Sequence, residues 1–131
     1  MSTNTFSAFK DDPTQQLARS PGQRLEAMRQ SAPLVQNITN YVAMNVMANV
    51  LIASGAAPAM VHAPEEAAEF VAVASALTIN IGTLSRDWVE SMTTAAAAAQ
   101  ETRTPWVLDP VAVGVTGYRN ETCLTLLEHR P

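Results

Sequence analysis

Residues 33–60 read PLVQNITNYVAMNVMANVLIASGAAPAM, and this run decides the fold class. The apolar pair at 34–35 predicts a short strand, and the polar residues QNITN at 36–40 then predict a turn. Apolar side chains follow helical spacing over residues 41–54, just before a glycine of the kind that commonly ends a helix. A second apolar run at 57–61 predicts another buried strand. A strand, a helix and a strand in succession indicate a parallel unit with a right-handed crossover.

The same alternation extends to both sides of this run. Ser20, Pro21 and Gln23 supply the N-cap, the first-turn proline and the capping-box partner of an earlier helix that runs toward Gln30. Downstream, the patterns predict a helix over 64–75, a strand over 77–81, a helix from 85 through the alanine run 95–99, a strand over 106–108, and a last helix to Leu127.

Short apolar strands separated by longer helices predict the α/β fold class, with a parallel central sheet and flanking helices. A chain of 131 residues suits one compact domain better than two. We expect residues 20–131 to form this domain and residues 1–19 to be a flexible tail.

Charge and composition exclude several classes of function. A formal net charge of -4 leaves no basic surplus for a phosphate backbone, so we expect no nucleic-acid partner. The single cysteine, Cys123, allows neither an internal disulfide nor a cysteine-based metal cluster. Residues 42–60 carry no charge, but Asn45 and Asn49 interrupt them, and the N-terminus shows no secretory pattern. We therefore expect no membrane partner and a cytoplasmic location.

Ligands of parallel sheets bind where the strands end, at the carboxyl edge. The segments that follow the predicted strands are 36–40, Met60 with His62, 80–83 and 109–114. Asp109 suits a metal ion or a ligand hydroxyl, because hard cations prefer carboxylate oxygen. An aspartate that only caps its own loop is the alternative.

The other candidates at this edge also have a structural interpretation beside the functional one. Asn37 and Asn40 can hydrogen-bond a heterocycle, but asparagine before a helix is also common capping material. Met60 fits core filling, and its backbone N–H can contact a ligand. His62 has no visible partner and fits an ordinary loop histidine. Cys123 fits a small buried hydrophobe.

Several nucleotide and hydrolase motifs do not occur in the sequence. It contains no Walker A pattern, no GxSxG elbow and no HExxH helix, and no GxGxxG follows the first strand. If the protein uses ATP, it does not do so as a P-loop enzyme.

Three ordered segments resemble the hydroxyethylthiazole kinase family: residues 33–60, ALTINIGTLS at 76–85 and PWVLDPVAVGVTGYR at 105–119. The resemblance extends from Ser20 to the end of the chain. It implies a ribokinase-like fold and transfer of the ATP γ-phosphate to the hydroxyl of 4-methyl-5-(2-hydroxyethyl)thiazole in thiamine biosynthesis, with Mg2+. It also implies a homotrimer with active sites at the subunit interfaces.

By this resemblance, Asn40, Val42 and the backbone of Met60 line the thiazole pocket, and Asp109 lies near the magnesium and the phosphates. The sequence departs from the family pattern at a few positions. These are Gln36, where a histidine is frequent, Ala112, where a glycine is usual, and Gly117-Tyr118-Arg119, where Pro-Phe-Arg is usual.

The family's catalytic segment has no counterpart in these residues. An Arg-Gly-Asn stretch with a following glutamate, and a Gly-rich turn carrying the residue that activates the alcohol, come after the position of Pro131. The resemblance thus implies the N-terminal part of one kinase domain with no catalytic residue in it, and we expect residues 1–131 alone to be inactive. We also expect the strand at 106–108 to lack a neighbour and to promote aggregation.

Two alternatives remain open on the sequence. One is another ribokinase-like small-molecule kinase, of the hydroxymethylpyrimidine type. The other is a non-catalytic α/β module that binds a small molecule or a partner subunit.

Overall fold

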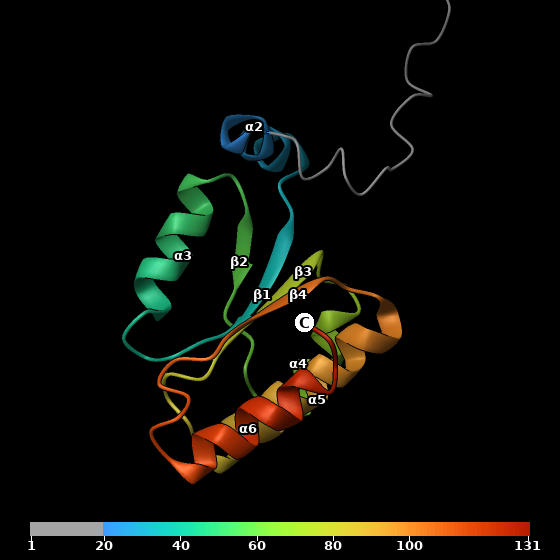
Figure 1. The fold of residues 1–131 in the computed structure, drawn as a ribbon. Coiled ribbons are helices and arrows are strands. Elements are labelled where there is room, and N and C mark those ends of the chain that lie inside the picture. The colour runs from blue at the N-terminus through green and yellow to red at the C-terminus, as the bar shows by residue number, and fades with distance from the viewer. Residues whose placement is uncertain (1–19) are drawn as a thin grey trace, which may run out of the picture.

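The computed structural model describes residues 20–131, so the tail predicted for residues 1–19 lies outside the described residues. Helices and strands alternate throughout (Figure 1). Their order is α2 (Pro21–Ser31), β1 (Leu34–Ile38), α3 (Met44–Ala53), β2 (Ala57–Ala59), α4 (Pro64–Val71), β3 (Ala76–Asn80), α5 (Arg86–Thr102), β4 (Trp106–Asp109) and α6 (Gly117–Leu127). The strands form one parallel sheet in the order β2-β1-β3-β4, which confirms the predicted α/β class.

Helices α2 and α5 both begin at a capping serine. Ser20 and Gln23 form a reciprocal capping box at α2: the Ser20 backbone N–H donates to Gln23 Oε1 at 2.9 Å, and the Gln23 N–H donates to Ser20 Oγ at 3.3 Å. At α5, Ser85 Oγ accepts a hydrogen bond from the Trp88 N–H at 3.2 Å. These side chains satisfy N–H groups that a helix start leaves unpaired, so they fix where each helix begins.

The core lies between the sheet and the helices α4, α5 and α6, which lie together on one side of it (Figure 1). Strand side chains such as Ile38, Ile79 and Leu77 are fully buried there. The alanine run of α5 is buried as well, at Ala95, Ala96 and Ala99. Because alanine carries only a methyl group, it lets α5 approach its neighbours closely, and this explains the low-complexity stretch.

Helix α3 lies beside β2, away from α4, α5 and α6 (Figure 1), and none of its residues is buried. It begins at Met44 rather than Tyr41, because the Ala43 N–H donates to Asn40 Oδ1 at 2.8 Å and closes a turn first. After α3, Gly55 has a φ of +93°, and a Cβ there would lie 2.8 Å from Arg29 Cα. The glycine is therefore required both by the helix end and by contact with α2.

The prediction of a turn over residues 36–40 is wrong for its first half. Gln36, Asn37 and Ile38 belong to β1, and all three side chains are buried. The Gln36 amide donates to the carbonyls of Val61 at 3.1 Å and Ala67 at 3.0 Å. Distant backbone groups thus satisfy the buried amide nitrogen, while Gln36 Oε1 has no hydrogen-bond partner within residues 20–131. The local sequence carries no sign of these distant partners.

Strand β4 lies at one edge of the sheet and, within residues 20–131, pairs only with β3. This agrees with the expected open edge, while the expected aggregation stays a prediction.

The predicted helix over 64–75 is shorter in the structure, where α4 ends at Val71. None of the helices in the described region combines the length and the apolar character that crossing a membrane requires.

Candidate functional site

A chain of side-chain hydrogen bonds crosses the carboxyl edge of the sheet. Asn40 Nδ2 donates to Asn80 Oδ1 at 2.8 Å, and Asn80 Nδ2 donates to Asp109 Oδ2 at 2.7 Å. The parallel register explains the second contact, because it pairs Asn80 at the end of β3 with Asp109 at the end of β4. Three residues far apart in the sequence are thus held together at this edge.

Gly82 lies directly against this chain of hydrogen bonds. Its N–H donates to Asn80 Oδ1 at 2.8 Å. A Cβ at this position would lie 2.8 Å from Asn80 Oδ1 and 2.9 Å from Asn40 Cβ. Only glycine leaves room for the two asparagines to meet, which accounts for the glycine in the segment 80–83.

Arg119, near the start of α6, connects two loops of the same edge. Its Nη1 donates to the carbonyls of Ile81 and of Val111, the latter at 3.1 Å, and its Nη2 donates to the Gly82 carbonyl at 3.0 Å. A guanidinium can make several such bonds at once because its donors lie in a fixed plane. Arg119 therefore ties the loop after β3 to the loop after β4.

The loop after β4 contains one strained position. Ala112 has a φ of +57°. This left-handed conformation costs a residue with a Cβ about 1–2 kcal/mol. A glycine at this position would adopt the same conformation without this cost.

The loop that contains Met60 is fixed from two sides. Gln36 of β1 holds the Val61 carbonyl, and the Ser91 hydroxyl of α5 donates to the His62 carbonyl at 2.7 Å. Gln36 and Ser91 are both fully buried. The backbone that follows Met60 is therefore held in one arrangement by buried side chains from the core.

His62 and Tyr41 both contact Trp88, whose ring centroid lies 5.0 Å from that of His62 and 4.8 Å from that of Tyr41. His62 Nδ1 is buried and has no hydrogen-bond partner within residues 20–131. The structure thus shows a packed histidine and assigns it no catalytic partner.

Cys123 is a buried free thiol, as expected.

The predicted site residues all lie at the carboxyl edge, but they do not form one compact cluster. Asn40 and Asp109 are joined through Asn80. Met60 follows β2 and so lies at the other side of β1 from Asp109. The Val42 side chain, in the turn before α3, is 90% exposed. The ligand roles of these four residues remain predictions.

Asn37 has neither of the uses that the sequence suggested. Its side chain is buried, donates to the Val35 carbonyl at 2.8 Å, and accepts from Thr78 Oγ1 at 2.7 Å. It links strands within the sheet. Asn80 and Arg119 each make three side-chain hydrogen bonds at this edge. The sequence placed the segment 80–83 at the edge but assigned neither residue a role.

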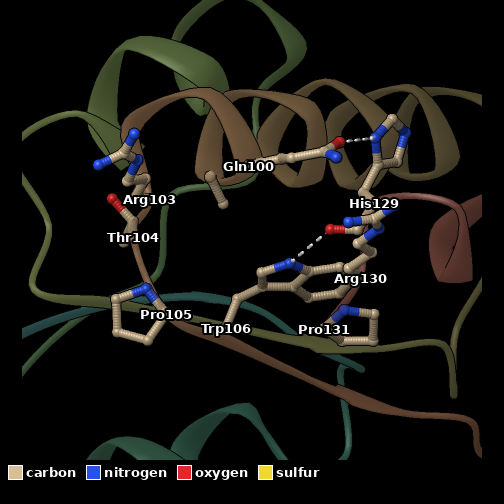
Figure 2. A pocket seen from close by; sticks show the side chains of 9 residues that line it. Gln100, Arg103, Thr104, Pro105, Trp106, His129, Arg130 and Pro131 are labelled. Atoms are coloured by element: carbon tan, nitrogen blue, oxygen red, sulfur yellow. Dashed lines mark hydrogen bonds between the residues drawn. The ribbon is translucent and has the colours of Figure 1, made fainter.

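A cleft of about 330 Å³ lies at the opposite end of β4 (Figure 2). Trp106 lines it, with its Nε1–H donating to the His129 carbonyl at 3.4 Å, and His129 Nδ1 lies 3.3 Å from Gln100 Oε1. None of the predicted site residues lines this cleft. Since ligands of parallel sheets bind at the carboxyl edge, we do not assign the site to it.

Comparison with known proteins identifies the family. A model described as the hydroxyethylthiazole kinase family matches residues 25–131. Hydroxyethylthiazole kinase of Rhizobium johnstonii is 60% identical over 116 residues, which are 88% of this chain and 43% of the relative. The enzyme of Roseobacter denitrificans is 57% identical over 112 residues, which are 86% of this chain and 44% of the relative.

A solved structure gives the same result. The hydroxyethylthiazole kinase protein from Pyrococcus horikoshii OT3 superposes with a TM-score of 0.78 at 48% identity, over 80% of this chain and 41% of the other. The predicted ribokinase-like α/β fold is thereby confirmed. The chain spans about two fifths of the length of these relatives. Its sequence and its fold place it in the hydroxyethylthiazole kinase family.

Proposed function

We propose that residues 20–131 are the N-terminal part of a kinase domain that transfers the ATP γ-phosphate to the hydroxyl of 4-methyl-5-(2-hydroxyethyl)thiazole in thiamine biosynthesis. The observation that carries the proposal is the bonded row Asn40, Asn80 and Asp109 at the carboxyl edge of a sheet with this family's fold. At one end of this row, the Asn40 amide can hydrogen-bond a small heterocyclic alcohol. At the other end, the Asp109 carboxylate can bind a cation.

Asp109 is the residue that we assign to Mg2+. No group of three or more metal-ligating side chains forms within residues 20–131, so this part of the chain offers no closed cage. Mg2+ typically takes only one or two carboxylates and completes its shell with water and substrate phosphates, and the exposed Asp109 fits this pattern. When bound with ATP, the ion supplies positive charge against the phosphates.

Asn40 keeps hydrogen-bonding capacity for the thiazole alcohol. Its Oδ1 accepts from the Ala43 N–H and its Nδ2 donates to Asn80, each at 2.8 Å. A side-chain amide has two N–H donors and two lone pairs on oxygen, so one donor and one acceptor remain. Together with Val42 and the backbone of Met60, Asn40 would form the thiazole pocket.

The test of this function is ATP-dependent phosphorylation of the thiazole alcohol by the full-length protein, followed by product mass and ADP release. We expect turnover with the thiazole alcohol and none with hydroxymethylpyrimidine. Residues 1–131 alone should give no turnover, because phosphoryl transfer requires groups that position and neutralise the γ-phosphate.

The results of this assay would distinguish the thiazole kinase from the two alternative functions. Phosphorylation of the pyrimidine in preference to the thiazole would favour the other type of ribokinase-like kinase. A full-length protein whose melting temperature rises with the thiazole alcohol, without any turnover, would favour a binding module. Measurable turnover by residues 1–131 alone would contradict the expected inactivity.

The proposal includes a homotrimer in the cytoplasm, with neither nucleic acid nor membrane as a partner. Support for self-association comes from α3, where Val46 and Val50 lie one turn apart on the same face and are 62% and 57% exposed. Apolar side chains gathered on one uncovered helix mark a protein interaction site more often than open surface.

Replacing Val46 with glutamate should weaken this association. A charge placed in an apolar interface loses its hydration without a partner, so we expect the full-length protein to shift from trimer toward monomer. Light scattering after size-exclusion chromatography measures the mass. Val73→Glu is the matched control, since Val73 is 68% exposed and lies after α4, away from α3. Equal effects of the two changes would argue against α3 as the interface.

A further inference from the structure

The Asn80 side chain makes three hydrogen bonds, more than the side chain of Asn40 or Asp109 makes. It is only 7% exposed. Its Oδ1 accepts from Asn40 Nδ2 and from the Gly82 N–H, both at 2.8 Å, and its Nδ2 donates to Asp109 Oδ2 at 2.7 Å. Both oxygen lone pairs are therefore occupied, and the nitrogen faces the carboxylate.

These contacts allow the amide only one orientation. If the amide were turned over, its nitrogen would face two other N–H donors and its oxygen would face a carboxylate oxygen. The Gly82 N–H cannot change its direction, because it belongs to the backbone. Gly82 in turn is held through its carbonyl by Arg119 at 3.0 Å. The backbone therefore fixes which end of Asn80 meets Asp109.

The bond from Asn80 determines how Asp109 presents its carboxylate. Within the described region, the Asn80 amide is the only side chain that hydrogen-bonds to Asp109, and it takes Oδ2 alone. Asp109 is otherwise exposed, so its Oδ1 stays available for a ligand. Asn40 differs, because the Ala43 N–H holds its oxygen independently of Asn80. Loss of Asn80 would therefore release Asp109 more than Asn40.

We infer that Asn80 is a positioning residue, which holds the Asp109 carboxylate in the orientation that receives a divalent cation. The inference rests on the proposed function, and it adds a residue for which the sequence suggested no role. Residues that orient a metal ligand through one hydrogen bond typically change metal affinity or activity by about 10–100-fold when removed.

The test replaces Asn80 with alanine in the full-length protein and measures Mn2+ binding by electron paramagnetic resonance, as well as the kinetic constants. We expect the dissociation constant for Mn2+, and the Mg2+ concentration that gives half-maximal activity, to rise about 10–100-fold. The KM for the thiazole alcohol should change less, because Asn40 keeps its bond to Ala43. In an Asp109→Asn background, Asn80→Ala should have no further effect on Mn2+ binding.

Thr78→Val is the matched control. Thr78 lies on the same face of β3 two residues earlier, and it also makes one side-chain hydrogen bond to a neighbouring strand, at 2.7 Å to Asn37 Oδ1. It does not contact Asp109. If Asn80 only stabilised β3, both variants would have a lower melting temperature, and Mn2+ affinity would not fall selectively in Asn80→Ala.

The outcomes decide between the inference and the proposed function. Unchanged Mn2+ affinity in folded Asn80→Ala, or an equal loss in Thr78→Val, overturns the inference even if the protein is an active kinase. Mn2+ binding that depends on Asp109 and Asn80, in a protein without kinase activity, supports the inference and removes the proposed function. If Asn80→Ala does not fold, Asn80→Ser takes its place, since its hydroxyl can accept from the Gly82 N–H.

Discussion

Replacing Trp88 with alanine should lower the free energy of unfolding by about 3–5 kcal/mol, the usual cost of removing a buried aromatic side chain. Trp88 is 5% exposed and contacts the rings of both Tyr41 and His62. Its removal leaves a cavity and also takes away the shared support of two loops at the carboxyl edge. Urea unfolding followed by circular dichroism at 222 nm measures the change.

Trp106→Ala is the control for position. Trp106 is similarly buried, at 7% exposure, but it lies at the other end of the sheet and lines the cleft of Figure 2. Both variants should lose stability, while only Trp88→Ala should shift the ring signals of His62 in a nuclear magnetic resonance spectrum. A loss below about 1 kcal/mol for Trp88→Ala would mean that the site can close around the missing ring.

Replacing Asp109 with asparagine should lower kcat of the full-length protein by a factor on the order of 100–1,000, the range observed when one electrostatic contributor to a transition state is removed. The side chain keeps its shape, and its oxygen can still accept from Asn80, so stability should change little. The KM for the thiazole alcohol should stay near its original value. Steady-state kinetics at saturating Mg2+ and ATP give both constants.

Asp87→Asn is the matched charge control, since Asp87 is exposed in the first turn of α5 and lies outside the bonded row. We expect its effect on kcat to be less than about threefold, because an isolated surface charge contributes little. If the two variants lost activity equally, Asp109 would not be the residue that faces the cation.

The sequence was sufficient for the fold class and for most element positions. Periodicity and capping residues act over a few neighbouring positions, and Ser20 with Gln23 formed the expected capping box. The carboxyl edge followed from strand order alone. The role of Asp109 as a candidate also followed, because a polar residue that ends a buried strand is conspicuous.

The contacts that link distant residues could not be read from the sequence. The burial of Gln36 depends on carbonyls 25 and 31 residues downstream. The bond between Asn80 and Asp109 depends on the exact register of β3 and β4, and a shift of one residue would separate the two side chains. The reach of Arg119 across two loops depends on where α6 starts. Each of these is a property of the packed chain.

The arrangement of Arg119 has a consequence for how the family can diverge. Its guanidinium binds main-chain oxygens of residues 81, 82 and 111 and does not depend on the side chains at those positions. Substitutions at Val111 can therefore accumulate during evolution without breaking the connection, whereas Ile81 is constrained by the core in which it is buried and Gly82 by the space around it. The loop after β4 can thus acquire new side chains, and with them new preferences, while its anchorage to the rest of the molecule persists.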